Sequence, residues 1–294
     1  LTTQAEELTA RRAVNKRTYL FFEKRPILMK INLIVKLSII FYTTTVLGAD
    51  KEQIIKKVVS YTKNQKNPST EYILKTLEDR RLKIDVDVID RFKNKPEKMK
   101  TYEQYRKIFF NEQRISGGIS FYKKNKKLIS KVARDFEIDP IVLVAIIGVE
   151  TNYGLKTTEF SVINSLYTQA VKMPKRSSWA TKEIAEFLIF CSENDIDPFS
   201  FEGSYAGAFG YGQFIPSSFN KLSIDYDKDG KKDPFSWEDV IGSIAFYLTE
   251  NGYPKNDFNF SHKSKAWRAI RTYNRSDKYA NVVIDLRNEI AKNI

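Results

Sequence analysis

The spacing of apolar residues divides the chain into a series of predicted helices. From Asp50 to about Asp135, apolar residues recur every three or four positions and lysines fill many positions between them, as in KEQIIKKVVSYTKN and EYILKTLEDRRLKIDVDVIDRFKN. That period is typical of amphipathic helices whose charged faces lie in water. Breaks are expected at 67–70, at Pro96 and at Gly117–Gly118. Strict alternation is weak everywhere, so we expect few strands.

The most apolar segment of the second half predicts a central helix. In DPIVLVAIIGVETNYG, Asp139 is a typical N-cap residue and Pro140 suits the first helical position. Residues 141–151 are apolar on almost every side, so the helix is expected to be buried, with Gly154 ending it. Glu150 is the exception, because its charge is costly in such surroundings unless something pairs with it.

A second amphipathic helix is expected over SSWATKEIAEFLIFCSEND. Cys191 is the one cysteine of the chain, so no intramolecular disulfide forms, and its spacing predicts a buried small hydrophobe. His262, the one histidine, lies in the polar string NFSHKSK and is expected in solvent. These counts exclude Ser-His-Asp and Cys-His sites and a histidine-rich zinc site, and no GxxxxGK[ST] phosphate loop occurs. Catalysis would rely on carboxylates, hydroxyls, amides or a hard metal ion.

Charge and the N-terminal segment indicate an exported protein. The 294 residues carry a formal net charge of +13, which suits nucleic acid, acidic lipid or an acidic cell-wall polymer as partner. Residues 29–49 combine a basic start, an apolar run and a small-residue exit, the layout of a signal peptide, and 1–28 form an upstream extension. Because the apolar run is short and no cysteine follows it, we expect no stable membrane anchor. The remainder divides into an N-terminal helical region, 50–135, and a core, 136–294.

Two interpretations of Glu150 are open on spacing alone. It is either a helix-end carboxylate in water or a general acid whose pKa is raised by an apolar wall, as a glycosidase needs to protonate a leaving oxygen. The stretch GSYAGAFGYGQF favours the second. Its glycines allow a ligand to approach closely, and Ser204, Tyr205, Tyr211 and Gln213 offer uncharged hydrogen bonds, which suit a sugar chain. A close-packed helix junction is the alternative for this stretch.

Alternating aspartates follow in DYDKDGKKDPFSWED. Asp225, Asp227 and Asp229 match the first half of a calcium loop, in which alternating oxygens surround a hard cation. The twelfth position is Ser236 where an EF-hand has glutamate, so a standard EF-hand is not complete. A surface turn rich in Asp and Gly is the alternative. Because three alternating carboxylates repel one another without a cation, we favour a metal site, structural in role because no sequence feature places it near Glu150.

The last motif lies near the C-terminus, where AIRTYNRSDKYA carries Asn274, Ser276 and Tyr279; alone, a helix cap explains it. Taken together, these stretches resemble the membrane-bound lytic murein transglycosylase B family. The resemblance rests on IIGVETNYG, GSYAGAFGYGQFIPSSF, the aspartate loop, IGSIAFYL and YNRSDKYA in this order, with YEQYRKIFFNEQRISGGISFY upstream. It covers the chain from about Tyr102 to Ala280.

The resemblance implies a fold that is mainly α, a lysozyme-like catalytic core with an additional N-terminal helical region and little β structure. It also implies a lytic transglycosylase, which cleaves the β-1,4 bond between N-acetylmuramic acid and N-acetylglucosamine in peptidoglycan without adding water. The muramic 6-hydroxyl attacks its own anomeric carbon and leaves a 1,6-anhydro end. A single acid, helped by the substrate's acetamido group, then suffices where ordinary glycosidases need two carboxylates.

Matched position by position, the resemblance assigns roles to residues of this chain. Glu150 would act as the acid and then as the base, and Ser204 would orient it. The residues implied for sugar binding are Gln213, Asn274, Tyr247, Tyr279 and Tyr105, and Arg176 would face the peptide carboxylates. The calcium ligands would be Asp225, Asp227, Asp229, the Lys231 carbonyl and Asp239, with the EF-hand-like loop spanning 225–239. No cofactor for catalysis is implied.

The chain also departs from the family, and other functions remain open. Only a short segment separates AFYLTENGY from YNRSDKYA, so the family's inserted β domain is expected to be absent or reduced to a hairpin. The expected location is the periplasm, with the protein acting as a monomer on peptidoglycan glycan strands. One alternative is a non-catalytic peptidoglycan-binding or scaffold protein on the same fold. A nucleic-acid-binding protein is motivated by charge alone, and the scattered lysines argue against it.

Overall fold

The computed structural model describes residues 50–94, 98, 101–155 and 159–294, which belong to one compact unit. The predicted signal peptide, 29–49, the extension 1–28 and the expected break at Pro96 lie outside these residues. Among the residues described, no helix combines the length and the apolar character needed to cross a membrane.

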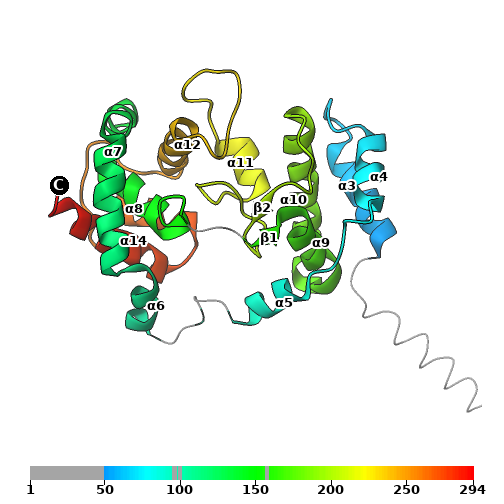
Figure 1. Ribbon diagram of the computed structural model, residues 1–294, viewed down its shortest axis with the longest axis horizontal. Helices are drawn as coiled ribbons and strands as arrows, with labels where there is room; N and C mark the ends of the chain where they lie inside the picture. Colours follow the sequence, from blue (N-terminus) through cyan, green and yellow to red (C-terminus); the bar gives the residue numbers. More distant parts are fainter. Residues whose placement is uncertain (1–49, 95–97, 99–100, 156–158) are drawn as a thin grey trace, which may run out of the picture. The chain divides into compact units, whose positions relative to one another are not determined.

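Helices make up most of the described chain, as the sequence predicts (Figure 1). In chain order the elements are α3 (Lys51–Thr62), α4 (Thr70–Glu78), α5 (Val86–Lys93), α6 (Tyr102–Phe109), α7 (Glu112–Phe136), α8 (Pro140–Thr151), β1 (Phe160–Ser161), α9 (Val162–Lys172), α10 (Pro174–Glu193), β2 (Glu202–Gly203), α11 (Pro216–Leu222), α12 (Trp237–Glu250), α13 (Lys265–Tyr273) and α14 (Asp277–Ala291).

The predicted central helix is α8, which packs between α7 and α14 (Figure 1). Asp139 caps it as expected, because its Oδ1 accepts hydrogen bonds of 2.9 Å from the amides of Ile141 and Val142. Nearly every residue of the helix is buried, which confirms the prediction from its apolar sequence. The helix ends at Thr151, and the next three residues, 152–154, all have positive φ, so the chain reverses sharply.

The break expected at Gly117–Gly118 is wrong, because both glycines lie inside α7. A Cβ on Gly117 would come within 2.9 Å of the Tyr153 ring. One on Gly118 would meet Ile290 Cδ1 at 2.4 Å and the Tyr153 hydroxyl at 2.5 Å. The glycines therefore serve close packing of α7 against the segment after α8 and against α14, at the cost of some helix propensity.

Short strands confirm that β structure is sparse in the described chain. β1 and β2 pair antiparallel over two residues each, with Phe160 opposite Gly203. Residues 251–264, between α12 and α13, contain no strand, as expected for a chain without the inserted β domain. The second predicted amphipathic helix is α10, which begins three residues early because Pro174 occupies its first turn. Cys191 is fully buried and His262 is exposed, as predicted.

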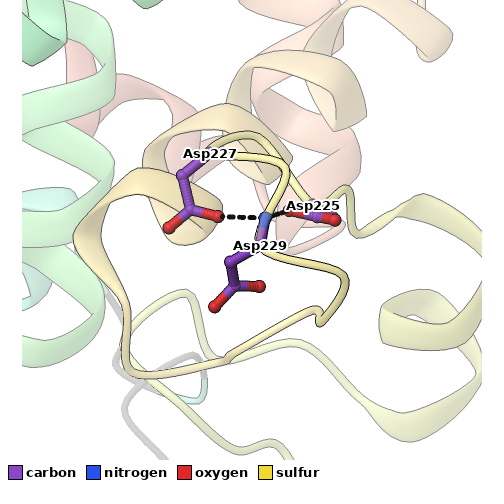
Figure 2. A group of neighbouring side chains, drawn as sticks. All are labelled: Asp225, Asp227 and Asp229. Atoms are coloured by element: carbon purple, nitrogen blue, oxygen red, sulfur yellow. Dashed lines mark hydrogen bonds between the residues drawn. The ribbon is translucent and has the colours of Figure 1, made fainter.

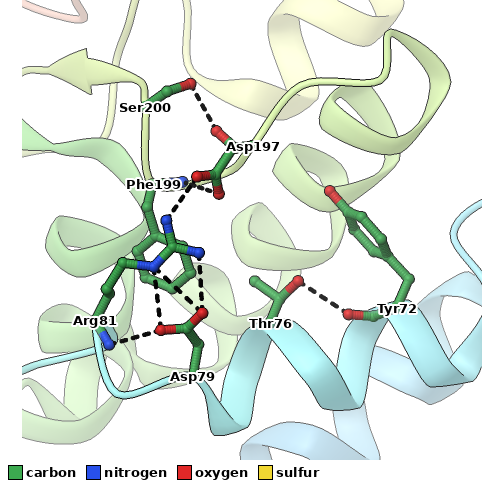
Figure 3. Close-up of polar contacts among 7 residues, drawn as sticks. All are labelled: Tyr72, Thr76, Asp79, Arg81, Asp197, Phe199 and Ser200. Carbon is green, nitrogen blue, oxygen red and sulfur yellow. Dashed lines mark hydrogen bonds and ion pairs between the residues drawn. The ribbon is translucent and has the colours of Figure 1, made fainter.

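The N-terminal helices α3 and α4 bury apolar side chains in the common core, and a polar contact around Arg81 adds to this attachment (Figure 3). The Arg81 guanidinium lies 2.9 Å from Asp79 Oδ2 and 2.6 Å from Asp197 Oδ2, and 4.3 Å above the ring of Phe199. Asp79 follows α4, whereas Asp197 and Phe199 follow α10. Buried side chains of α9 add to this attachment, because Thr168 Oγ1 accepts a hydrogen bond from the amide of Asp85 at 2.8 Å.

Substitution of Gly118 by Ala tests the packing of α7. An exposed helical Gly→Ala change normally stabilises a helix by about 1 kcal/mol. Here the added methyl group overlaps Ile290 and Tyr153, so we expect the free energy of unfolding to fall by about 1–3 kcal/mol. Chemical denaturation measures the change, and Ser120→Ala, at an exposed position of the same helix, is the control. A gain in stability for Gly118→Ala would contradict the observed packing.

Candidate active site

The site is built around Glu150, in the last turn of α8. Its side chain is half-buried, so neither a fully solvated nor a fully enclosed carboxyl describes it. Tyr279 of α14 donates a hydrogen bond of 2.7 Å from its hydroxyl to Glu150 Oε1. Tyr279 is 1% exposed, and this burial, together with the charge of Glu150, holds the pKa of its phenol well above the usual value. The phenol therefore stays protonated and remains a donor to the carboxylate.

Three tyrosines continue from Glu150 as a row, Tyr279, Tyr273 and Tyr247. The rings of Tyr279 and Tyr273 are nearly parallel, with centroids 6.3 Å apart, and Tyr247 meets Tyr273 edge-on at 4.8 Å. Tyr273 donates to the Gly212 carbonyl at 2.6 Å, and Tyr247 donates to the Thr272 carbonyl at 2.9 Å. The row thus joins the catalytic candidate to the glycine-rich loop and to α12.

Sequence reasoning predicted Tyr247 and Tyr279 but missed Tyr273. Its only signal is its place directly before Asn274 in the motif YNRSDKYA. Burial and the charge of Glu150 hold the pKa of Tyr273 well above the usual value. Tyr105 of α6 is also buried, at 1% exposure, and acts electrostatically on Tyr279. Asn274 follows α13 and is exposed. Of the predicted residues, Tyr279 contacts the Glu150 carboxyl directly, and the sugar-binding roles of the others stay predictions.

Arg114 of α7 supports the same helix end and was also missed from the sequence. Its Nη1 donates to the carbonyls of Gly148 at 2.9 Å and Val149 at 3.3 Å. A cation at these carbonyls satisfies acceptors that the helix end leaves over and opposes the negative end of its dipole. The Tyr153 hydroxyl donates to the Arg114 carbonyl at 2.7 Å, so a second hydrogen bond joins α7 to the segment after α8. Burial lowers the pKa of Arg114, and the charges of Tyr153 and Glu150 act in the opposite direction.

The loop after β2 is a close-packed junction that also presents polar groups. A Cβ on Gly203 would lie 2.3 Å from the Ala208 carbonyl, and Gly210 has φ +71° against Pro234. The Ser204 hydroxyl accepts from the amide of Ala208 at 3.1 Å, within the loop. Gln213 has φ +50°, and its Nε2 donates to the Gly210 carbonyl at 2.9 Å. These contacts support the close-packed junction, and sugar binding by this stretch and the orientation of Glu150 by Ser204 stay predictions.

Arg176, on the first turn of α10, lies between two aromatic rings. Its guanidinium carbon is 4.1 Å from the ring centroid of Trp179 and 4.9 Å from that of Phe92. Its Nε donates to Gln169 Oε1 at 2.8 Å, and Gln169 in turn donates to the Tyr205 carbonyl at 3.2 Å. These contacts fix the Arg176 guanidinium beside the glycine-rich loop. A guanidinium is planar and can form paired hydrogen bonds with a carboxylate.

The three alternating aspartates come together as predicted (Figure 2). One carboxylate oxygen each of Asp225, Asp227 and Asp229 lies within 4.8 Å of the others. The hydrogen bond from the Asp229 amide lowers the pKa of Asp227, but desolvation by the neighbouring loop and the charges of Asp239 and Asp229 outweigh it, so the pKa of this exposed carboxyl is raised. The cluster is thus electrostatically strained, and its oxygen donors suit a hard cation such as Ca²⁺.

The other two predicted calcium ligands have separate contacts in the loop. The Asp239 side chain is 3% exposed and accepts from the amides of Tyr226 at 2.7 Å and Asp233 at 2.8 Å. Lys231 donates from its amide to Asp229 Oδ1 at 2.8 Å. Ligation by Asp239 and by the Lys231 carbonyl stays a prediction.

One residue of the aspartate loop, Trp237, contacts the segment after α8, whereas the separation of the aspartates from Glu150 stays a prediction. Trp237, at the end of the loop, stacks on Tyr211 with centroids 4.4 Å apart and an angle of 17°. A Cβ on Gly154 would lie 3.1 Å from the Trp237 ring and 3.3 Å from that of Tyr211. Thr151, the residue after Glu150, donates to the Tyr211 carbonyl at 3.3 Å. Trp237 therefore packs against the residues that follow the helix of Glu150.

Helical architecture and a half-buried glutamate closing a central helix define a lysozyme-like protein. Residues 50–264 match the family described as Transglycosylase SLT domain, and the chain belongs to this family. It is similar to membrane-bound lytic murein transglycosylase B of Escherichia coli (strain K12), with 32% identity over 154 residues. That alignment covers 52% of this chain and 43% of the relative, so it spans less than half of the relative's length.

Solved structures share the fold. Soluble lytic transglycosylase SltB1 from Pseudomonas aeruginosa superposes with a TM-score of 0.72 and 27% identity, covering 82% of this chain and 99% of that one. The Escherichia coli lytic transglycosylase Slt35, solved in complex with calcium, has a TM-score of 0.72 and 22% identity, with 84% and 94% covered. The second likeness is one of fold alone.

A buried carboxyl on α10, that of Glu183, makes the stability of the contact between α10 and α11 depend on pH. Glu183 is 2% exposed and accepts from the amide of Ser217 at 2.9 Å and from its hydroxyl at 2.8 Å. Burial raises the pKa of Glu183 above its ordinary value of 4.5, although the two hydrogen bonds act against this shift. The folded state therefore holds a proton that the unfolded state has already released. Its contribution to stability is complete below about pH 4.5 and is lost as the pH rises through the native pKa.

Glu183→Gln tests this sign. The amide resembles the protonated acid, and it can accept from the Ser217 amide and donate to the Ser217 hydroxyl. We expect the melting temperature of the variant to match the wild type near pH 4 and to exceed it by a growing margin toward pH 7. Thermal denaturation across this range measures the difference, with the exposed Glu193→Gln as control. A constant difference at all pH values would contradict the assignment.

Proposed function

We propose that this chain is a lytic transglycosylase that cleaves the β-1,4 bond between N-acetylmuramic acid and N-acetylglucosamine in peptidoglycan. The observation that carries the proposal is Glu150, a half-buried carboxyl that receives a hydrogen bond from a buried tyrosine at the end of an apolar helix. Membership of the transglycosylase family and the activity named for its relatives support it.

The reaction needs one group that first gives a proton and then takes one. Glu150 in its acid form protonates the bridging oxygen as the bond to the muramic anomeric carbon breaks, and the N-acetylglucosamine end leaves as an alcohol. The muramic 6-hydroxyl then attacks that carbon, with the acetamido group assisting, and Glu150 accepts the hydroxyl proton. The bonds balance without water, and the product is a 1,6-anhydro end. Tyr279 stabilises the carboxylate between the two steps.

Other residues bind and orient the strand. In this proposal Ser204 orients Glu150, and the side chains assigned to the sugars are Gln213, Asn274, Tyr247, Tyr279 and Tyr105. Their uncharged donors and aromatic faces match hydroxyl and acetamido groups. Arg176, held flat between Phe92 and Trp179, is the group proposed for peptide carboxylates.

A structural calcium ion is also part of the proposal. Asp225, Asp227 and Asp229 would hold it, with Asp239 and the Lys231 carbonyl completing the set. The ion would neutralise their charge and order the loop, and it would take no part in the chemical step. The close carboxylates and the raised pKa of Asp227 support it, as does the calcium complex of the related Slt35 fold. We further propose a monomeric enzyme of the bacterial cell envelope, exported to the periplasm by residues 29–49.

Glu150→Gln is expected to abolish turnover while keeping the fold. The amide has the same shape but cannot donate or accept the catalytic proton, so the rate should fall by at least about 100-fold. Mass spectrometry of digested peptidoglycan sacculi measures it: wild-type products should be about 18 mass units lighter than hydrolysed ones, the mass of one water. Glu193→Gln is the control. Full-mass reducing ends would indicate a hydrolase, and binding without release would indicate a wall-binding protein.

Calcium is expected to raise the melting temperature. A ligand at about 100 times its Kd stabilises the folded state by about 2.7 kcal/mol, or about 5–10 °C for a domain of this size. Thermal scans with Ca²⁺ and with chelator measure the shift. Asp227→Asn should remove most of it, whereas Asp257→Asn, outside the loop, should not. Equal melting temperatures with and without calcium would rule out the site.

A further inference from the structure

A polar groove of about 520 Å³ lies at one end of the tyrosine row, with Tyr247 in its lining. It is formed by α10, α11 and α12, and α11 lies between the other two (Figure 1). The polar side chains that line it are Lys182, Glu186, Ser218, Asn220, Lys221 and Asn251. Most of these residues have no role in the proposed chemistry at Glu150.

Tyr247 connects the groove to the candidate active site. Its side chain lines the groove and also forms the far end of the tyrosine row, 4.8 Å from the Tyr273 ring. From Tyr273 the row reaches Tyr279 and the carboxyl of Glu150. Two ring contacts and one hydrogen bond therefore separate the lining of the groove from the Glu150 carboxyl, which is within the reach of an extended polymer bound at Glu150.

The groove contains amide oxygens with capacity left to bind. The Asn220 amide nitrogen donates to the backbone carbonyl and to Oε2 of Glu186, both at 2.9 Å. The Asn251 amide nitrogen donates to the Tyr247 carbonyl at 2.8 Å. These bonds use both N–H groups of Asn220 and one of Asn251, and they fix both amides. The side-chain oxygens of the two amides can accept from N–H groups. Such acceptors suit a peptide backbone.

Two lysines and one carboxylate, that of Glu186, line the groove, and Lys182 also acts electrostatically on the buried Glu183. Lys182 and Lys221 are exposed, and neither forms an ion pair within the part of the chain that the structure describes. The carboxylate of Glu186 is bonded to Asn220, and Glu183 is buried against Ser217 beneath the groove. Ammonium groups gain little from uncharged hydroxyl and acetamido groups, but they attract carboxylates.

We propose that this groove binds the carboxylate-bearing peptide side chains of the strand, through Lys182 and Lys221. The inference rests on the proposed function and extends it, because it assigns a second peptide contact, separate from Arg176 and on the far side of the tyrosine row from Glu150. The lysines attract the carboxylates, and the oxygens of Asn220 and Asn251 accept from the peptide amides.

The test is a double-mutant cycle in which the lysines of the protein and the carboxylates of the ligand are removed separately and together. Peptidoglycan strands are prepared with native peptides and with the peptide carboxylates converted to carboxamides, which removes the charges and keeps the shape. Dissociation constants are measured by calorimetry on the non-cleaving Glu150→Gln protein, with and without Lys182→Gln and Lys221→Gln. Lys123→Gln with Lys126→Gln, at exposed positions of α7, gives the same change in net charge as a control.

The lysine pair should weaken binding of native strands by about two- to twentyfold, the range expected for two exposed ion pairs. Amidated strands should bind equally to proteins with and without the lysines, and the α7 control should have no effect on either ligand. Equal losses on native and amidated strands would assign the groove to the sugars and overturn the proposal, as would no loss on either. Turnover by the wild-type protein is measured separately, so a failed cycle and a failed catalytic function are distinguished.

Discussion

The end of α8 is the constraint on which the rest of the site depends. A helix that is apolar on nearly every side must be buried, yet its last turn carries a carboxyl and leaves carbonyl groups without intrahelical partners. Two different helices supply hydrogen-bond donors to these carbonyls and to the carboxyl. Arg114 of α7 takes the carbonyls of Gly148 and Val149, and Tyr279 of α14 takes the carboxyl of Glu150. The helices that cover α8 are therefore the ones that complete the site.

The sharp reversal after α8 explains why the aspartate loop and the site belong together. Residues 152–154 all adopt positive φ, a conformation that costs energy for Asn152 and Tyr153 and persists only where the surroundings hold it. Trp237 and Tyr211 pack against Gly154, and Tyr153 packs against the glycines of α7. A cation that orders the aspartate loop would thus also support the backbone that ends the helix of Glu150. Stability and positioning are not separate roles for such an ion.

Local sequence signals predicted the parts of this structure that local chemistry determines. Asp139 and Pro140 predicted the start of α8, and the apolar periodicity predicted a mainly helical fold. The alternation of aspartates predicted that their carboxylates would lie close together. Gly117–Gly118 were misread because a glycine pair that breaks a helix and one that admits a neighbouring ring look alike in sequence. Arg114 and Tyr273 were missed because their partners are distant in the chain and only the packing of α7 and α13 brings them together.

Neutral and cationic side chains lie in different places relative to Glu150. A cation in direct contact with a carboxyl favours its ionised form. On the side of α14 the phenol of Tyr279 donates to Glu150, whereas on the side of α7 the Arg114 guanidinium acts electrostatically on Glu150 and donates to the carbonyls of Gly148 and Val149. The tyrosine row provides a neutral zone, while Arg176 is held among aromatic rings beside the glycine-rich loop and Lys182 and Lys221 lie beyond Tyr247. In the proposed function, the cations that attract the peptides of an acidic polymer would then act at a distance from Glu150, on the other side of the tyrosine row or beside the glycine-rich loop.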